Sequence, residues 1–373
     1  MSDPVRALAV VDLGAVERNS ATLVGGLAGD AGLCAVVKAN GYGHGAVECA
    51  RAALAGGAGM LAVATAAEAV ELRAALPDAP LLVMGALSPP EVDVALWAGA
   101  EVAAWRAGFL ALVERRGAGL GIRPRVHIKH DTGMGRLGES EPDAVRELVA
   151  AAARSESVDL AGLWTHFATA DEPGSEFFDQ QLERFRDLAE PLKDEHPGLL
   201  LHAANSAATL RDRSSHFDMV RCGIAIYGLD PFGSDPFAHG LEPALELRSY
   251  VADVKRFPVG ASAGYGRRWL APSDRWVGVV PVGYGDGVRR GLSNNGEVLA
   301  GGRRHEIVGT VSMDNVTIDL GADAAVAPGT PAILIGADGD QRILCEEVAE
   351  RLETINYEVM CGISPRVPRE YRR

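Results

Sequence analysis

The sequence lacks the features that mark three large classes of protein. No stretch approaches the roughly 18 consecutive apolar residues of a membrane-spanning helix. The N-terminal MSDPVRALAVVDL has no basic segment followed by a long apolar run, so it does not have the form of a signal peptide. The net charge of −14 leaves no excess of Lys and Arg to neutralise a nucleic-acid backbone. We therefore expect a cytoplasmic protein that binds neither membrane nor nucleic acid.

Cysteine is also scarce. There are five, an odd number, and no two are spaced as CxxC, so the sequence indicates neither a disulfide framework nor a cysteine metal cluster. We expect no bound metal, and free thiols in a reducing compartment. The five residues are Cys34, Cys49, Cys222, Cys345 and Cys361.

What the sequence has is a repeated pattern in its first 240 or so residues. Short apolar runs alternate with longer segments of helical periodicity, which is typical of a parallel sheet. After an opening strand near Val5–Val11, the apolar runs end at Lys38, Thr65, Gly85, Trp105, Lys129, His166, Ala204 and Arg221. Eight strand–helix units in series favour a closed (β/α)8 TIM barrel, and an open doubly wound sheet is the alternative.

The pattern changes near Leu241, after a stretch rich in Gly and Pro. Long helical segments become sparse, and short β-like runs alternate with Gly, Pro and Asp turns. We expect an α/β barrel over residues 1–240 and a second, mostly β domain over residues 241–373. The first strand, about residues 1–12, is expected to join the β domain.

In a barrel, the functional side chains stand at the carboxyl ends of the strands and on the loops that follow. Reactive or ligand-binding residue types occur at several of these positions. They are Lys38, Lys129, Arg136, His166, Asn205, Ser206, Arg221, Gly223 and Ile224.

Lys38, in AVVKANGYGHG, closes an apolar strand, where an unpaired ammonium is costly to bury. Either its amine reaches solvent at the strand end, or its pKa is depressed and suits it to form a Schiff base. The glycines that follow allow close approach of the backbone to a ligand, but their spacing is not that of a dinucleotide-binding motif. Tyr42 could reach a phosphate or be an ordinary loop tyrosine.

The loops after the seventh and eighth barrel strands commonly bind phosphate. Here Ser206 offers a hydroxyl, and Gly223 and Ile224 can present backbone amides. A Schiff-base lysine and a barrel phosphate site together indicate pyridoxal 5′-phosphate (PLP).

The chain resembles the alanine racemase family in many separated motifs, which occur in family order over nearly the full length. They are AVVKANGYGHG, VHIKHDTGMGRLG, WTHFATAD, HAANSAA, VRCGIAIYG, GAGYGRRW, VGYGDG, VGTVSMDN and RVPREY. Thr310 and Ser312, in VGTVSMDN, depart from the Arg and Cys that the family more often has there.

The resemblance implies interconversion of L- and D-alanine, with D-alanine supplied for peptidoglycan. Lys38 would carry PLP and act as one base, and Tyr265 would act as the other. His166 and Arg221 would form a hydrogen-bonded chain toward Tyr265. Arg221 would face the pyridine nitrogen of PLP, to which an arginine can donate but from which it cannot accept a proton.

The resemblance also assigns the remaining residues. Arg136 would contact the phenolic oxygen of PLP and the substrate carboxylate, and Lys129 would be either carbamylated, orienting Arg136, or an ordinary lysine. The cofactor set would further include Tyr42, Asn205, Ser206, Gly223, Ile224 and Tyr357. Met313 and Tyr284 would line the substrate entrance, with Asp314 behind them. The family forms homodimers in which Tyr265 and Met313 reach the PLP held by Lys38 of the other subunit.

Three other functions share some of these motifs. They are a broad-spectrum amino-acid racemase, a barrel-type PLP decarboxylase, and a non-catalytic PLP-binding protein. Decarboxylases of this type typically place an acid at the pyridine nitrogen, where this chain has Arg221. A non-catalytic single barrel would lack the C-terminal domain that carries Tyr265 and Met313.

Overall fold

The computed structural model describes residues 5–323 and 325–373. The chain divides into two compact units. Val16–Ile226 form the first, here called the barrel unit. The second, the β unit, combines the residues up to Ala15 with Tyr227–Arg373.

The barrel unit contains eight parallel strands in a single sheet, so the prediction of a TIM barrel is confirmed. The strands are β2 (Gly32–Val36), β3 (Met60–Val63), β4 (Leu81–Val83), β5 (Glu101–Ala104), β6 (Arg125–Lys129), β7 (Asp159–Trp164), β8 (Leu200–His202) and β9 (Met219–Cys222). From β2 to β8 each strand pairs with the next in chain order, and β9 pairs with β2. Two backbone hydrogen bonds, from Asp218 N to Leu201 O and from Arg221 N to Ala204 O, link β8 and β9 and nearly close the barrel.

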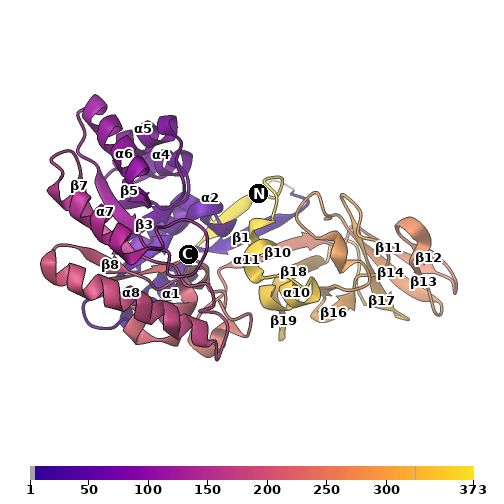
Figure 1. The fold of residues 1–373 in the computed structure, drawn as a ribbon. Helices are drawn as coiled ribbons and strands as arrows, with labels where there is room; N and C mark the ends of the chain where they lie inside the picture. Colours follow the sequence, from indigo (N-terminus) through magenta and orange to yellow (C-terminus); the bar gives the residue numbers. More distant parts are fainter. Residues whose placement is uncertain (1–4, 324) are drawn as a thin grey trace. The chain divides into compact units, whose positions relative to one another are not determined.

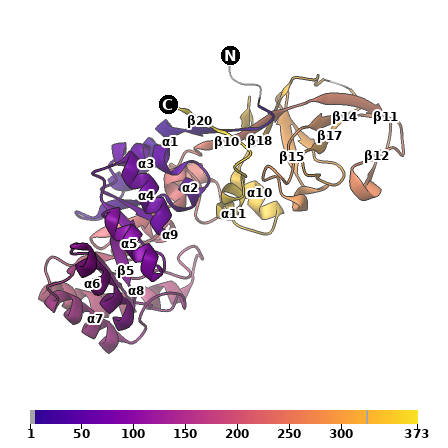
Figure 2. The ribbon, with the colours of Figure 1, turned by 90° about the horizontal axis from the view of Figure 1, so that it is seen from above.

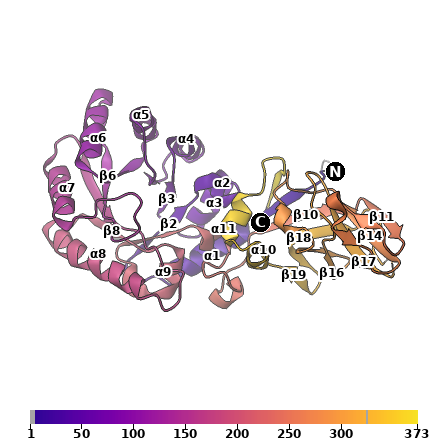
Figure 3. The same ribbon diagram turned by 45° about the vertical axis from the view of Figure 1, so that its right-hand side comes forward.

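Helices surround these strands in chain order, as Figure 3 shows. They are α1 (Leu13–Gly25), α3 (Ala46–Ala55), α4 (Ala66–Ala75), α5 (Pro89–Trp97), α6 (Ala107–Leu120), α7 (Pro142–Arg154), α8 (Glu176–Glu195) and α9 (Ser206–Arg211). The shorter segments are α2 (Lys38–Tyr42), the 3-10 turn η1 (Arg213–Ser215) and η2 (Ile224–Tyr227), which ends at the boundary of the unit.

The strands are buried on both faces, which explains why their sequences are nearly continuous apolar runs. Polar side chains inside such strands are costly unless they are hydrogen-bonded. Four of them nevertheless lie in the barrel strands and are at most 3% exposed: His127, Lys129, His202 and Arg221. These four polar residues are the exceptions to the apolar packing of the barrel strands.

The β unit is built on a seven-stranded sheet with the order β16-β15-β18-β10-β1-β20, to which β19 adds by pairing with β18. Figure 2 shows β1, β10, β18 and β20 side by side. The strands are β1 (Leu8–Asp12), β10 (Leu245–Tyr250), β15 (Glu297–Ala300), β16 (Arg303–Glu306), β18 (Pro331–Asp338), β19 (Gln341–Ile343) and β20 (Arg369–Arg372). The first strand of the chain therefore pairs here, antiparallel to β10 and parallel to β20.

Two smaller sheets and several short helices complete the β unit (Figure 1). The sheets contain β11 (Asp253–Phe257), β14 (Arg275–Val280) and β17 (Val316–Gly321), and separately β12 (Ser262–Ala263) and β13 (Trp269–Leu270). The helices are α10 (Cys345–Arg351), α11 (Asn356–Cys361), η3 (Pro236–His239), η4 (Tyr265–Arg267) and η5 (Arg290–Leu292). A mostly β C-terminal region is thus confirmed.

Cys34, Cys49, Cys222 and Cys345 are buried thiols, and Cys361 is exposed. Within the described ranges, no helix combines the length and the apolar character needed to cross a membrane.

Candidate functional site

Lys38 begins a left-handed backbone turn. β2 ends at Val36, although the backbone N–H of Val37 still donates to Ala62 O at 2.9 Å. Ala39, Asn40, Gly41 and Tyr42 then all have φ between 52° and 61°. For residues other than glycine this conformation costs roughly 1–2 kcal/mol each. Backbone strain persists only where the surroundings enforce it, and it clusters at functional sites.

Glu68 is one of the groups that enforce this turn. It lies in the first turn of α4, where its Oε2 accepts the amides of Ala64 and Thr65, while Thr65 Oγ1 accepts the amide of Glu68. This is a capping box. The other oxygen, Oε1, accepts the amide of Ala39 at 2.6 Å. The start of α4 therefore anchors the backbone next to Lys38.

Three of the predicted phosphate-binding residues, Ser206, Gly223 and Tyr42, lie together in the barrel unit. Ser206 Oγ accepts the amides of Gly223, at 3.1 Å, and Ala225, at 3.4 Å. A Cβ atom on Gly223 would collide with the hydroxyl of Tyr42, so only glycine leaves room there for that phenol. Asn205 caps α9 by accepting the amide of Ala208 at 2.9 Å. A hydroxyl, a phenol and backbone amides therefore converge, as a phosphate requires.

Arg221 is buried and is held by four acceptors. Its NH2 donates to Thr165 O at 2.8 Å, to Ala203 O at 3.0 Å and to His166 Nδ1 at 3.3 Å, and its NH1 donates to His202 Nδ1 at 2.9 Å. Burial lowers the pKa of Arg221 to about 10, so the guanidinium stays protonated at neutral pH. Because arginine can only donate, both histidines must accept at Nδ1.

His166, two residues beyond the end of β7, is kept uncharged. Its burial, and after that the positive charge of Arg221, lowers the pKa of its imidazole well below the usual value. Arg136, Lys129 and Lys38 act in the same direction. His166 can therefore pass on a hydrogen bond, but it does not carry a positive charge at neutral pH.

Lys129 is the last residue of β6 and is 2% exposed. Its Nζ lies 4.3 Å from the ring centroid of Trp164. Burial, followed by the charges of Arg136 and Arg221, lowers the pKa of Lys129 to about 7. About half of the amines are consequently neutral at pH 7, compared with fewer than about one in a thousand for an ordinary lysine.

Arg136 is carried by a loop that is organised around Asp131. Asp131 Oδ1 accepts the amides of Gly133 at 3.0 Å, Met134 at 2.7 Å and Gly135 at 3.1 Å, and Oδ2 accepts the amide of Arg136 at 3.0 Å. Burial raises the pKa of Asp131, but these hydrogen bonds outweigh it and the pKa is lowered overall. One carboxylate thus fixes the whole loop.

Four cationic side chains influence one half-buried histidine, His166, in the barrel unit: Lys38, Lys129, Arg136 and Arg221. Lys129 and Arg221 are buried, Lys38 is half-buried and Arg136 is exposed, and such a concentration of positive charge is unfavourable by itself. It favours a ligand with more than one negative charge, such as a phosphate ester together with a carboxylate. Lys129, whose pKa is lowered, is suited in such a site to act as a nucleophile or base.

Tyr265 lies in the β unit at the start of η4 and is 74% exposed. The residue before it, Gly264, has a φ of 68°, and a Cβ there would lie 2.8 Å from Thr310 N. Thr310 Oγ1 donates to the carbonyl of Tyr265 at 2.7 Å. Thr310, one of the two departures from the family pattern, therefore holds the backbone of the predicted second base.

Tyr284 and Met313 lie on two loops of the β unit that are bonded to each other. Tyr284 N donates to Ser312 O at 3.0 Å, and both Tyr284 and Met313 are about half exposed. Ser312, the second departure, donates from its hydroxyl to Asn315 O at 2.7 Å and so closes the turn that carries Met313. Asp314 accepts from Arg366 at 2.7 Å.

The predicted residues thus form two groups, one in each unit. In the barrel unit, the predicted residues linked by direct contacts are His166 with Arg221, Ser206 with Gly223, and Tyr42 with Gly223. Ile224 follows Gly223 and is fully buried. Tyr265, Tyr284, Met313, Asp314 and Tyr357, which is in α11, belong to the β unit. Their roles stay predictions.

Sequence reasoning missed three carboxylates and a histidine pair that support these residues. Glu68 had a visible signal, because Thr65 and Glu68 stand at the spacing of a capping box. Asp131 precedes a glycine-rich loop, where an Asx side chain often accepts nearby amides. Glu101, His127 and His202 gave no local signal, since they meet only through the register of the barrel.

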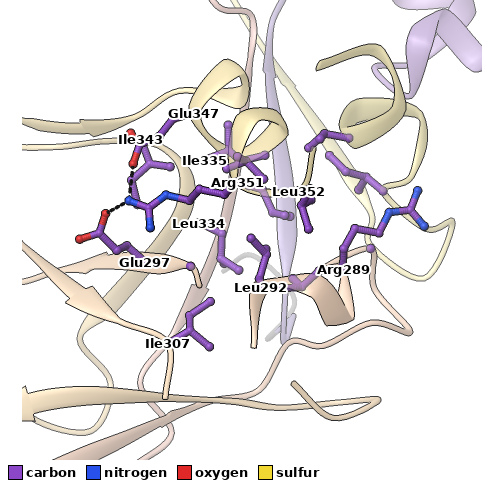
Figure 4. A pocket seen from close by; sticks show the side chains of 17 residues that line it. Arg289, Leu292, Glu297, Ile307, Leu334, Ile335, Ile343, Glu347, Arg351 and Leu352 are labelled. Atoms are coloured by element: carbon purple, nitrogen blue, oxygen red, sulfur yellow. Dashed lines mark hydrogen bonds and ion pairs between the residues drawn. The ribbon is translucent and has the colours of Figure 1, made fainter. Parts of the chain in front are cut away.

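The β unit also contains an apolar pocket between its large sheet and helices α10 and α11 (Figure 4). Its lining includes Leu292, Ile307 and Ile335. At one side, Arg351 donates to Glu297 at 2.5 Å and to Glu347 at 3.0 Å. None of the predicted site residues lines this pocket, whose apolar side chains are mostly buried core of the unit.

Comparison with known proteins gives matches over both units. Residues 11–231 match the N-terminal domain of alanine racemase, and residues 244–371 match its C-terminal domain. The chain is 42% identical to alanine racemase of Frankia casuarinae, over 98% of this chain and 96% of the relative. It is 41% identical to alanine racemase 1 of Bacillus subtilis, over 97% and 92%.

The solved structures that superpose on this chain include alanine racemases. Alanine racemase from Streptomyces coelicolor superposes with a TM-score of 0.94 at 38% identity, covering 100% of this chain and 99% of that chain. The enzyme from Bacillus anthracis with bound L-Ala-P superposes with a TM-score of 0.90 at 38% identity, covering 98% and 95%.

Proposed function

The chain belongs to the alanine racemase family and is an isomerase that interconverts L- and D-alanine, and we propose that it does so with two bases and PLP. The observation that carries the proposal is the gathering of four cationic side chains around half-buried His166, together with the cradle of Ser206, Gly223 and Tyr42 in the same unit. An anionic cofactor with a phosphate fits both features.

The residues of the barrel unit fit PLP one by one. Lys38 would bind it covalently, and Arg136 would donate to its phenolic oxygen. Ser206, Asn205, Ile224, Tyr42, Gly223 and, from the β unit, Tyr357 would hold its phosphate side. When bound, PLP supplies an electron-withdrawing ring that makes the α-hydrogen of an attached amino acid removable.

Arg221 would donate to the pyridine nitrogen. Its guanidinium remains protonated and cannot take a proton from the ring. The negative charge that develops at the α-carbon would then be short-lived, which favours return of the proton over side reactions. This property also disfavours the alternative of a barrel-type decarboxylase, which typically has an acid at this position.

Two bases are needed because inversion requires a proton to leave one face of the α-carbon and another to arrive on the opposite face. Nζ of Lys38 would serve one face and the phenolic oxygen of Tyr265 the other. Neutral His166, fixed by Arg221, would extend a hydrogen bond toward Tyr265. Arg136 and the amide of Met313 would hold the substrate carboxylate, with Tyr284 and Asp314 shaping the entrance.

Lys129 would be carbamylated. Only a neutral amine attacks CO2, and the pKa of about 7 leaves a large neutral fraction. The carbamate would turn a cation that repels Arg136 into an anion that attracts it. In protein prepared with 13C-labelled bicarbonate, we expect a carbamate signal that is absent from Lys129→Arg.

The protein would act as a homodimer with shared sites. Tyr265, Met313 and Tyr284 are 74%, 51% and 44% exposed, which is unusual for large apolar side chains that are expected to act in a closed site. In a dimer with two-fold symmetry, each copy would cover these three residues of the other copy in the same way. The D-alanine produced would supply peptidoglycan synthesis.

The proposal is tested with the purified chain, L-alanine and chiral chromatography. We expect D-alanine to form until the enantiomers are equal, and Lys38→Ala to abolish both turnover and the borohydride-reducible cofactor. Lys255→Ala, at a largely exposed position in β11, is the matched control and should behave as wild type. Wild-type protein that binds PLP but forms no D-alanine would exclude a racemase. Faster turnover of serine or basic amino acids would favour the broad-spectrum alternative.

The biosynthetic role has its own test. The gene should restore growth without added D-alanine to a bacterium that has lost its own alanine racemase, and the Lys38→Ala form should not. Restoration by both forms would contradict the proposed role.

A further inference from the structure

A buried chain of hydrogen bonds runs through the barrel interior from Arg221 to a carboxylate. Arg221 NH1 lies 2.9 Å from His202 Nδ1, His202 Nε2 lies 2.9 Å from His127 Nδ1, and His127 Nε2 lies 2.6 Å from Glu101 Oε2. Arg125 donates to the other oxygen of Glu101 at 2.8 Å. The two histidines are 0% exposed and Arg221 is 3% exposed, so water does not compete for the bonds among these three residues, whereas the Glu101 side chain is 12% exposed.

The chemistry of the two ends fixes every proton in this chain. Arginine can only donate, so His202 accepts at Nδ1 and, being neutral, carries its hydrogen on Nε2. That hydrogen is donated to His127 Nδ1, so His127 also carries its hydrogen on Nε2 and donates it to Glu101. A carboxylate only accepts, which satisfies the last donor. All three bonds therefore point in one direction, and each polarises the next.

The charge states agree with this assignment. Burial, and after it the charge of Arg221 and the contact with His127, lowers the pKa of His202 well below the usual value. Burial raises the pKa of Glu101, but the hydrogen bonds from His127 and Arg125 and the charge of Arg125 outweigh it and lower that pKa overall. The chain thus has a cation at one end, two neutral rings, and an anion at the other.

The surrounding packing makes room for the rings and holds them in place. A Cβ atom on Gly162 would collide with Nδ1 of His127 and would lie 2.9 Å from its Cε1. The indole of Trp164 stacks on His202 with an interplanar angle of 4° and a centroid distance of 5.6 Å. Gly162 thus leaves space for the ring of His127, and Trp164 covers one face of the ring of His202.

We propose that Glu101 and His127 are positioning residues that act through His202 to fix the rotation of the Arg221 guanidinium beneath the cofactor. A carboxylate directly against Arg221 would fix it too, but would cancel its charge. Two neutral imidazoles hold the guanidinium while the anion stays at the far end of the barrel. The inference rests on the proposed function, because it is Arg221 that would face the pyridine nitrogen.

The first measurement tests the chain of hydrogen bonds from Arg221 to Glu101 and does not depend on enzyme activity. In protein labelled with 15N-histidine, we expect both rings to show a protonated Nε2 and an unprotonated Nδ1, with the Nε2 hydrogen of His127 far downfield. Signals are assigned with His127→Gln and His202→Gln. Glu101→Gln keeps the shape and one acceptor but loses the charge, so the His127 hydrogen should move upfield and that of His202 should follow. Unchanged His202 signals would show that the bonds are not coupled.

The second measurement concerns the effect on Arg221. We expect kcat in both directions to fall about threefold in Glu101→Gln and about tenfold in Glu101→Ala, with KM within twofold of wild type. Gly162→Ala, which displaces His127 without removing a polar group, should change the same imidazole signals and also lower kcat. Glu114→Gln is the matched control, because Glu114 accepts from Ser155 Oγ at 2.7 Å outside the chain and should leave kcat unchanged.

The outcomes separate this inference from the proposed function. A wild-type protein without racemase activity would refute the proposed function. The imidazole signals would still test the chain of hydrogen bonds. Active wild type with unchanged kcat in both Glu101 variants would overturn the positioning role. A fall in melting temperature with kcat per folded molecule unchanged would show that the chain stabilises the barrel only, and this would also overturn it.

Discussion

Asp131→Asn tests whether one carboxylate organises the loop that carries Arg136. Four amides donate to Asp131, three to Oδ1 and that of Arg136 to Oδ2. Asparagine keeps one oxygen, so three amides retain a weaker acceptor. The amide nitrogen then faces the N–H of Arg136, donor against donor. The substitution therefore removes one bond and the charge from three others.

The expected magnitude follows from these contacts. A hydrogen bond to a charged group contributes about 1.5–3 kcal/mol, and the partial exposure of this loop reduces that value. We expect the ordered loop to lose about 2 kcal/mol, which corresponds to a roughly 30-fold smaller ratio of ordered to open loop. If Arg136 contacts the substrate carboxylate, kcat/KM for alanine should fall by up to the same factor. The melting temperature should change little, because the loop can open locally.

Hydrogen exchange measures the loop directly. The amides of Gly133, Met134, Gly135 and Arg136 should exchange roughly 30-fold faster in Asp131→Asn, by the same conversion. Asp187→Asn, an exposed position on α8, is the matched control and should leave these rates unchanged. Unaltered exchange in Asp131→Asn would refute the reasoning, whatever the activity.

The pH dependence has a definite sign. The pKa of Asp131 is lowered in the folded chain, so its contribution is fully present above the unfolded value of about 3.9. It is lost as pH falls through the lower folded pKa. In the wild type, hydrogen exchange of the loop amides, corrected for the intrinsic exchange rate, should therefore not change through titration of Asp131 between pH 5 and 8, by the same linkage. Asp131→Asn should show the open loop already at neutral pH.

The remaining predictions concern the proposed bases and the assembly. Tyr265→Ala should slow deuterium washout from one enantiomer of alanine more than from the other, and equal losses would contradict a one-face role. Thr310→Val removes the donor to the Tyr265 carbonyl, a bond contributing about 1 kcal/mol, so kcat should fall about fivefold, and an unchanged kcat would count against it. Arg221→Glu should slow racemisation and convert more cofactor to pyridoxamine phosphate, and a wild-type product ratio would argue that Arg221 does not face the ring. Mixed Lys38→Ala and Tyr265→Ala subunits should regain activity at roughly a quarter of all sites when half of the dimers are hybrid, and no recovery in confirmed hybrids would rule out shared sites.

The barrel is predictable from sequence because its strands are buried on both faces. Such strands appear as short apolar runs, and eight of them separated by helical segments leave few alternatives. The predicted strand ends are less exact: β2 and β7 end two residues before Lys38 and His166. Single backbone bonds continue there, from Val37 to Ala62 and from Thr165 to His202, although the regular pairing has stopped.

The supporting contacts are harder to predict because they depend on register and on backbone conformation. Nothing in the local sequence of Ala39 indicates a φ of 52°, since alanine ordinarily avoids that region. Glu101 and His127 are 26 residues apart, and their contact requires β5 and β6 to pair in one particular register. Sequence patterns identify the elements, whereas packing decides which polar side chains meet.

The charge state of His166 determines which group can hold the proton that is transferred. Burial alone lowers its pKa, and the surrounding cations lower it further. A bound phosphate and carboxylate would offset the cations but not the desolvation that is the largest cause of the lowered pKa, so the imidazole would stay neutral with a ligand present. Its Nδ1 is already occupied by the donor-only Arg221. His166 is then able to orient a partner through Nε2 but not to store a proton. The proton that enters or leaves on its side of the substrate must be held by the partner itself, which is the role proposed for Tyr265.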